Sequence, residues 1–174
     1  MTQEINTTVF GSDVSLRFSA PWAAYWLAFV RILTGWYIFR SGLTKILDWP
    51  FDASGYLLQG SAGTVLEPLL VFVGNTGPLL AVTNFMVPVG ELLIGVGLIF
   101  GGFVRLASFF GALLMGFFYF TNADWAAGAF SIEIAAMLLF MTLAVFGAGR
   151  VFGIDQYLES MNWAQNRWAR LLMG

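Results

Sequence analysis

Four long apolar runs, separated by more polar stretches, dominate the pattern of the chain. Each run has about 20 residues, the length that a helix needs to cross about 30 Å of hydrocarbon. A transmembrane β-barrel would instead show segments of about ten residues that alternate in polarity, and no such pattern is present. We therefore predict an all-α integral membrane protein, a bundle of four transmembrane helices at about residues 22–44, 79–100, 103–122 and 126–147.

Two further segments have helical patterns of their own. The connection between the first two runs has about 34 residues, which is long for a compact bundle. Its apolar stretch at 64–73 predicts a short helix within this outer loop. Beyond residue 155 apolar residues recur at helical spacing, so residues 155–173 are predicted to form an amphipathic helix at the membrane surface. No internal repeat divides the chain, which we treat as a single membrane domain, 1–174.

The distribution of basic residues predicts how the bundle is oriented. Four spans place both termini on the same side of the membrane, and cytoplasmic loops are the ones enriched in Lys and Arg. The side opposite the termini has only Arg40 and Lys45. We therefore expect a multi-pass protein of a prokaryotic plasma membrane, with both termini in the cytoplasm beside five arginines: Arg17, Arg105, Arg150, Arg167 and Arg170.

Composition agrees with a membrane location and limits the chemistry. The chain is 59% hydrophobic and 10% charged, with a mean hydropathy of +0.78, which is too apolar for the surface of a soluble domain. The lipid bilayer is its expected partner, and no nucleic-acid partner is expected. Histidine and cysteine are absent, which excludes disulfides, haem ligation by these residues, and Ser-His or Cys-His catalytic pairs. We predict no metal site and no covalently bound cofactor.

Charged residues inside the apolar runs are the strongest functional signal. An unpaired charge in the middle of a membrane costs at least about 2.5 to 3.5 kcal/mol, so such residues usually face the bundle and pair. Counted at about 1.5 Å per residue from the cytoplasmic ends of their helices, Arg31 and Glu91 both lie ~13 Å deep. We therefore predict that Arg31 and Glu91 form an ion pair.

A second pair is predicted nearer the outer side of the bundle. The same count places Glu133 at ~21 Å and Arg40 at ~27 Å from the cytoplasmic side, within reach of each other. Together with Lys45, the two pairs form a candidate intramembrane site. Arginine binds carboxylates, oxoanions and carbonyls with two donors, so the set is compatible with a quinone, anion or proton site. It is also compatible with ion pairs that only fix the helix register.

Three blocks of the sequence follow one another in a recognisable order and spacing. They are RILTGWYIFRSGLTK at 31–45, GELLIGVGLIFGGFVRLASFFGALL at 90–114 and GAGRVFGID at 147–155. Together they resemble the DoxX/DoxD family of small four-helix membrane proteins, which implies the same fold. In this resemblance the Arg and Glu of the family correspond to Arg31 and Glu91. The Gly-x-Gly-Arg to Asp end of the family corresponds to Gly147, Gly149, Arg150 and Asp155.

DoxD members of this family are similar to subunits of thiosulfate:quinone oxidoreductase, which passes electrons from thiosulfate to membrane quinone. The resemblance therefore implies a membrane subunit of a quinone-linked oxidoreductase, with quinone as a ligand and other redox subunits as partners. A chain with no Cys, His or recognisable flavin or nicotinamide motif has no obvious place to store electrons. A partner subunit, or direct transfer to bound quinone, supplies that step.

Two other functions stay open from the sequence. A structural or accessory subunit of a larger respiratory or other energy-converting complex predicts that other chains cover the lipid-facing helices. A small-molecule transporter predicts a water-filled polar path, which four helices in a monomer hardly enclose. The electron donor, the partner chains and homo-oligomerisation are left open.

Overall fold

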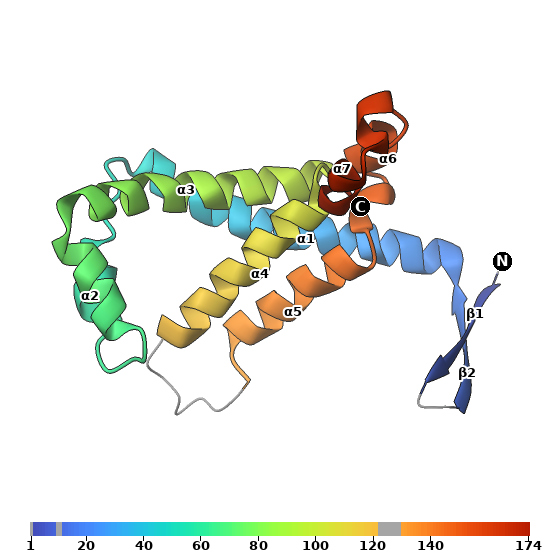
Figure 1. Cartoon of the computed structure of the whole chain (residues 1–174), viewed down its shortest axis with the longest axis horizontal. Coiled ribbons are helices and arrows are strands. Elements are labelled where there is room, and N and C mark those ends of the chain that lie inside the picture. The colour runs from blue at the N-terminus through green and yellow to red at the C-terminus, as the bar shows by residue number, and fades with distance from the viewer. Residues whose placement is uncertain (1, 10–11, 122–129) are drawn as a thin grey trace.

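The computed structural model describes residues 2–9, 12–121 and 130–174 (Figure 1). It begins with an antiparallel hairpin formed by β1 (Thr2–Val9) and β2 (Ser12–Ser19). The apolar pattern predicts no element in this polar segment, because periodicity reveals only elements with an apolar face. Beyond the hairpin, every regular element in the described part of the chain is a helix.

Four helices form the body of the molecule: α1 (Ala20–Leu47), α3 (Gly77–Phe100), α4 (Val104–Thr121) and α5 (Ile132–Val145). Helices α1 and α3 pack along each other, and so do α4 and α5. Figure 1 shows that α4 begins and α5 ends beside one end of α3, and that both diverge from α3 towards its other end. The bundle is therefore tight at one end and splayed at the other.

The helices lie where the apolar runs predict them. Helices α1 and α3 contain the runs 22–44 and 79–100, and α4 covers the run 103–122 except for its first and last residues. Helix α5 lies within the run 126–147, of which residues 126–129 lie outside the described residues. Two of these helices, α3 and α4, are both long and apolar enough to cross a membrane.

Glycines allow α1 and α3 to approach closely and set their register. A Cβ atom on Gly35 would lie 2.8 Å from the Cβ of Leu98, and a Cβ on Gly95 would lie 2.5 Å from the Cα of Phe39. Such distances leave no space for a larger side chain unless the helices separate. The same packing device joins α4 to α5, where Gly111 makes room for the ring of Phe140.

The long connection between α1 and α3 is folded onto the rest of the molecule. It contains a π-helix, η1 (Tyr56–Gly60), and a nine-residue helix, α2 (Glu67–Asn75), in the region where a short helix is expected. Leu57 and Leu70 are buried together in a small apolar cluster. The side-chain oxygen of Asn84 accepts a hydrogen bond of 2.8 Å from the main chain of the connection, which ties the connection to α3.

The predicted single tail helix at 155–173 is wrong. The tail forms three short helical segments, α6 (Ile154–Leu158), η4 (Asn162–Gln165) and α7 (Arg167–Leu172), of which α7 contacts α4. Tertiary contacts of the last two residues explain the difference. Met173 and Gly174 are buried, and the main-chain oxygen of Gly174 accepts a 2.6 Å hydrogen bond from the amide of Gly149. A straight helix could not return the chain to this position.

Candidate functional site

Glu91 has a partner in the bundle, and it is Lys45. The Nζ atom of Lys45 lies 2.7 Å from Oε2 of Glu91, whose side chain is only 1% exposed. The same Nζ donates a second hydrogen bond of 2.7 Å to the hydroxyl of Ser41, one turn earlier on α1. The structure therefore brings together two of the predicted site residues, as a buried carboxylate with an ammonium group beside it.

The predicted ion pair between Arg31 and Glu91 is wrong. The depth count treats the cytoplasmic ends of α1 and α3 as flush, whereas α1 extends well beyond α3. Gly35 lies against Leu98, close to the end of α3, so Arg31 is level with the loop that follows α3. Glu91 lies beside Gly42, eleven residues further along α1 than Arg31. That separation is about 16 Å along the helix axis.

Arg31 instead binds the main chain that follows α5. Its side chain is buried, and Nη1 donates to the carbonyl oxygens of Ala148 at 2.7 Å and Val151 at 3.0 Å. Nη2 donates to the carbonyl oxygen of Phe152 at 3.2 Å. Carbonyl groups at and beyond a helix C-terminus have no donor within the helix, and the guanidinium supplies donors for them. The contacts of Arg31 hold the tight end of the bundle together.

Glycines on two loops make room for this guanidinium. A Cβ atom on Gly101 or on Gly153 would collide with Nη1 of Arg31. Gly101 also has a φ of 70°, a left-handed conformation that glycine adopts without steric cost. Arg31 can therefore pack here only because Gly101, after α3, and Gly153, before α6, have no side chain.

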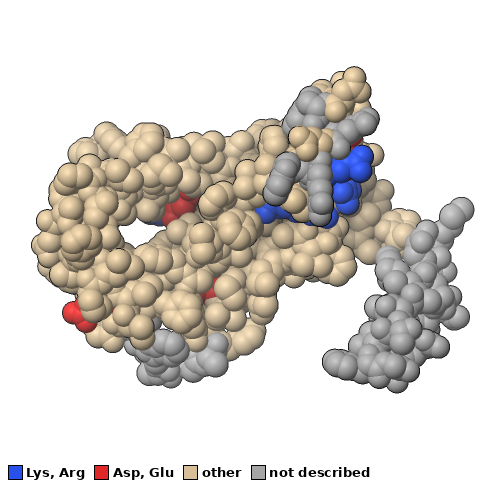
Figure 2. Space-filling view, in the orientation of Figure 1, with Lys and Arg blue, Asp and Glu red and all other residues tan. Residues whose placement is uncertain are grey.

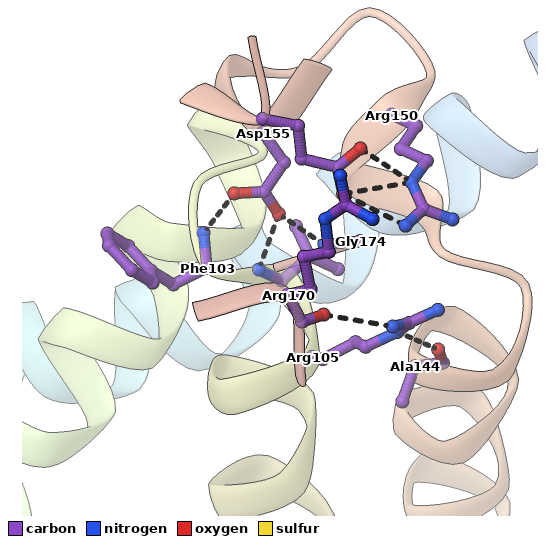
Figure 3. Close-up of polar contacts among 9 residues, drawn as sticks. Phe103, Arg105, Ala144, Arg150, Asp155, Arg170 and Gly174 are labelled. Atoms are coloured by element: carbon purple, nitrogen blue, oxygen red, sulfur yellow. Dashed lines mark hydrogen bonds and ion pairs between the residues drawn. The ribbon is translucent and has the colours of Figure 1, made fainter. Parts of the chain in front are cut away.

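Asp155 accepts hydrogen bonds from main-chain amides at the N-terminus of α4 (Figure 3). Its buried carboxylate accepts hydrogen bonds from the amides of Phe103 at 2.6 Å, Val104 at 2.9 Å and Gly174 at 3.0 Å. The first turn of a helix has free N–H groups and the positive end of the helix dipole, which favour an anion. A Cβ on Gly149 would collide with this carboxylate.

Figure 3 also shows the side chains of Arg105 and Arg150 near this cluster. Arg105 donates to the carbonyl oxygens of Ala144 at 3.3 Å and Arg170 at 3.2 Å. Arg150 forms an ion pair of 2.9 Å with Glu159, and both side chains are partly exposed. The block at 147–155 thus joins the ends of α1, α4 and α5.

The predicted pair of Arg40 with Glu133 is not found. Arg40 is exposed on α1, and neither of the two ion pairs that link described residues contains it. The register again explains the error, because the neighbouring residue Phe39 lies against Gly95. Arg40 is therefore beside the C-terminal half of α3, whereas Glu133 is in the first turn of α5, at the splayed end.

Glu91 and Glu133 both line a cavity of about 220 Å³ between the two helix pairs. Figure 2 shows an acidic residue (red) beside an opening in the molecular surface. Three hydroxyl-bearing side chains and four apolar ones complete the lining. The lining residues are Tyr37, Ile38, Ser41, Tyr56, Glu91, Met115, Phe118, Ile132 and Glu133.

Tyr56 brings the long connection into the cavity wall. Its hydroxyl forms a hydrogen bond with the hydroxyl of Thr121, and its ring packs edge-to-face on Phe118 with 6.1 Å between the centroids. Burial raises the pKa of Tyr56, and the charge of Glu133 raises it further, against the lowering effect of the Thr121 bond. The phenol is therefore neutral near pH 7.

The cavity combines few polar groups with an apolar wall, as sites for small organic ligands do. Its volume is below the roughly 300 to 1,000 Å³ of sites for drug-sized molecules. It therefore has room for a single ring or a head group, which the carboxylate oxygens and the hydroxyl groups would orient.

A family model described as DoxX matches residues 26–124, more than half of the chain. The chain belongs to the DoxX family. No curated protein and no solved structure matches it. DoxX proteins are generally membrane proteins, and the apolar helices α3 and α4 agree with a lipid bilayer environment.

Within this DoxX protein, the family match covers only part of the cavity and of the structural cluster. Lys45 and Glu91 lie inside the matched region, whereas Glu133 and Asp155 lie beyond it. Sequence reasoning missed Ser41 and Tyr56 as cavity residues. Ser41 was detectable, because it precedes Lys45 by one helical turn and thus shares its face. Tyr56 lies in the long connection, where no periodic pattern indicates its direction.

Proposed function

We propose that this DoxX protein is a membrane subunit of a quinone-linked oxidoreductase and that the cavity between Glu91 and Glu133 binds the quinone head group. The observation that carries the proposal is the cavity, with a volume of about 220 Å³, two carboxylates and three hydroxyl-bearing side chains on an otherwise apolar lining. A cavity of about 150 Å³ is large enough to bind benzene, so a ring with a few substituents fits.

The polar groups of the lining suit the two states of such a ligand. The hydroxyl of Ser41, which accepts a hydrogen bond from Lys45, donates to a carbonyl oxygen of a quinone, and carboxylates accept from the hydroxyls of a quinol. Lys45 keeps Glu91 charge-balanced in the bundle. Glu91 and Glu133 relay the two protons that the reduction of a quinone takes up along with two electrons.

The electrons come from another chain. Oxidation of two thiosulfate ions to tetrathionate releases two electrons, which is the donor reaction that the resemblance to DoxD proteins suggests. This chain has no cysteine, histidine or recognisable flavin or nicotinamide motif, so a partner subunit oxidises the donor and passes the electrons on. Thiosulfate:quinone oxidoreductase is the activity of that assembly, and this chain supplies its membrane-embedded quinone site.

The proposal includes four spans in a prokaryotic plasma membrane, with both termini in the cytoplasm. Helices α3 and α4 support two of the spans by length and apolarity. Helix α1 has 28 residues, about 42 Å at the rise of an α-helix. The 14 residues of α5 reach about 21 Å, so its span also uses residues on either side of the helix.

An accessory subunit without catalytic activity is the second candidate. It is favoured by the contacts of Arg31 and Asp155, which bind main-chain groups and leave the tight end of the bundle with a structural role. In that case the cavity is empty of quinone and the chain only supports other subunits.

The test is to fill the cavity and measure bound quinone. Ile38→Phe adds volume at a buried residue of the lining, whereas Ile32→Phe makes the same change at an exposed position of the same helix. The protein is purified in mild detergent with its partners, and the extracted quinone is quantified per chain. We expect Ile38→Phe to lose most of its quinone and Ile32→Phe to retain it. Equal quinone content in both folded variants would contradict the quinone site and favour the accessory subunit.

A further inference from the structure

The outer face of α1 is a continuous exposed stripe of apolar residues that contains one charge, Arg40. The opposite face of the helix packs on α3 through Gly35, Ile38 and Gly42. The exposed residues recur at intervals of three and four, the spacing of one helix face. They are Trp22 (76% exposed), Trp26 (67%), Phe29 (53%), Leu33 (56%) and Trp36 (54%), followed by Arg40.

Arg40 lies at a depth where lipid chains surround the bundle. Its neighbour Phe39 is level with Gly95 of α3, a helix long and apolar enough to span the membrane. Gly95 is five residues from the end of that helix, and Arg40 is one residue deeper. Its Cα is thus about 9 Å inside the end of α3, where an exposed guanidinium requires a counter-charge or contact with water.

No carboxylate among the described residues pairs with Arg40. A second copy of the chain has no carboxylate to offer on α3 or α5, because Glu91 and Glu133 both line the cavity. An anionic lipid of the bilayer can supply the counter-charge at this position.

The geometry of α1 brings the guanidinium to the level of the lipid head groups. Side chains of an α-helix lean towards its N-terminus, which for α1 is the end at which α3 stops. A long arginine side chain reaches from the hydrocarbon to the interface in this way. Trp36 lies one turn closer to that interface and is exposed, and tryptophan is enriched at this level of membranes.

We infer that Arg40 and Trp36 form a binding site for the phosphate group of an anionic phospholipid on the lipid-facing side of α1. The guanidinium donates two parallel hydrogen bonds to phosphate oxygens, and the indole packs beside the glycerol backbone of the lipid. The site is independent of the quinone proposal, because it lies on the exposed face of α1 and uses residues outside the cavity lining.

Native mass spectrometry of the purified protein tests this site. Detergent-solubilised protein is titrated with phosphatidylglycerol or with phosphatidylcholine, and the apparent affinity for the first bound lipid is measured. We expect preference for phosphatidylglycerol, and a loss of about tenfold or more in Arg40→Gln, the effect of removing a hydrogen-bonded charge. Arg40→Lys should lose less, because it retains the charge without the planar fork.

Two controls separate the site from general charge effects and from free phosphate. Arg170→Gln removes an exposed arginine of the tail and should leave the affinity for the first bound lipid unchanged. Inorganic phosphate in millimolar excess should not displace the lipid, because it lacks the acyl chains that hold a lipid in the membrane or micelle. The inference is overturned if Arg40→Gln binds phosphatidylglycerol as the wild type does, if inorganic phosphate displaces the lipid, or if a co-purified polypeptide cross-links at position 40 instead.

Discussion

The ion pair of Lys45 with Glu91 predicts a large coupling between two substitutions. The variants are Lys45→Met, Glu91→Gln and the double variant, each of which keeps the side-chain volume nearly constant. In Lys45→Met a carboxylate that is 1% exposed is left without its ammonium. Removing one partner of a buried ion pair costs about 3 to 5 kcal/mol, whereas replacing both is often close to neutral.

The structure places the expected values at the lower end of that range. Lys45 is 25% exposed, so solvent screens part of the interaction, and we expect about 3 kcal/mol for Lys45→Met. Glu91→Gln should cost less, about 1 to 2 kcal/mol, because the ammonium keeps its hydrogen bond to Ser41. The double variant should cost less than about 1 kcal/mol, which gives a coupling of at least about 3 kcal/mol.

Reversible unfolding in mixed micelles of mild detergent and dodecyl sulfate measures these free energies. The pair of Arg150 with Glu159 is a matched control, because it has a similar ion-pair distance of 2.9 Å with side chains 47% and 24% exposed. Its coupling should be below about 1 kcal/mol, as for other exposed pairs. If the Lys45 and Glu91 effects were additive within about 0.5 kcal/mol, the buried pair would not exist in the membrane protein.

Three further predictions concern the rest of the fold. Asp155→Asn should destabilise the protein by about 2 kcal/mol, because an amide replaces a carboxylate at three main-chain donors. Unfolding in mixed micelles measures this loss, and an unchanged midpoint would contradict the stabilising hydrogen bonds of Asp155. Gly95→Ala should cost about 1 to 3 kcal/mol by separating α1 from α3, while Gly90→Ala, which meets open space, should be neutral or stabilising; equal effects would contradict the register. A cytoplasmic reporter fused after Gly174 should be active and an exported reporter silent, and the opposite result reverses the topology.

The positions of the long helices were predictable because apolar runs of about 20 residues have few alternatives in a membrane. The partner of Glu91 was not, because the depth of a residue depends on how far one helix slides along another. Gly35 and Gly42 are seven residues apart on one face of α1, and together with Gly95 they set that register. A search for pairs of small residues on α1 and α3 would have placed Arg31 beyond α3 and Lys45 beside Glu91.

The tail shows a different limit. The apolar residues of the tail recur at helical spacing, and the short helices α6 and α7 form within it. Burial of Met173 and the hydrogen bonds of Gly174 fold the segment back and interrupt a single helix. Such contacts join residues far apart in the sequence and leave no periodic signal. The same holds for Tyr56, which enters the cavity from a connection without a periodic pattern.

Photoaffinity labelling with an azido-quinone tests the central claim most directly. Membranes that contain the assembled complex are illuminated with the probe, and labelled peptides are mapped by mass spectrometry with and without excess unmodified quinone. The account predicts competitive labelling at cavity residues such as Tyr37, Met115 and Ile132, and its loss in Ile38→Phe. Labelling confined to exposed positions such as Leu33 and Leu113, or unaffected by competitor, would contradict a quinone site in this chain.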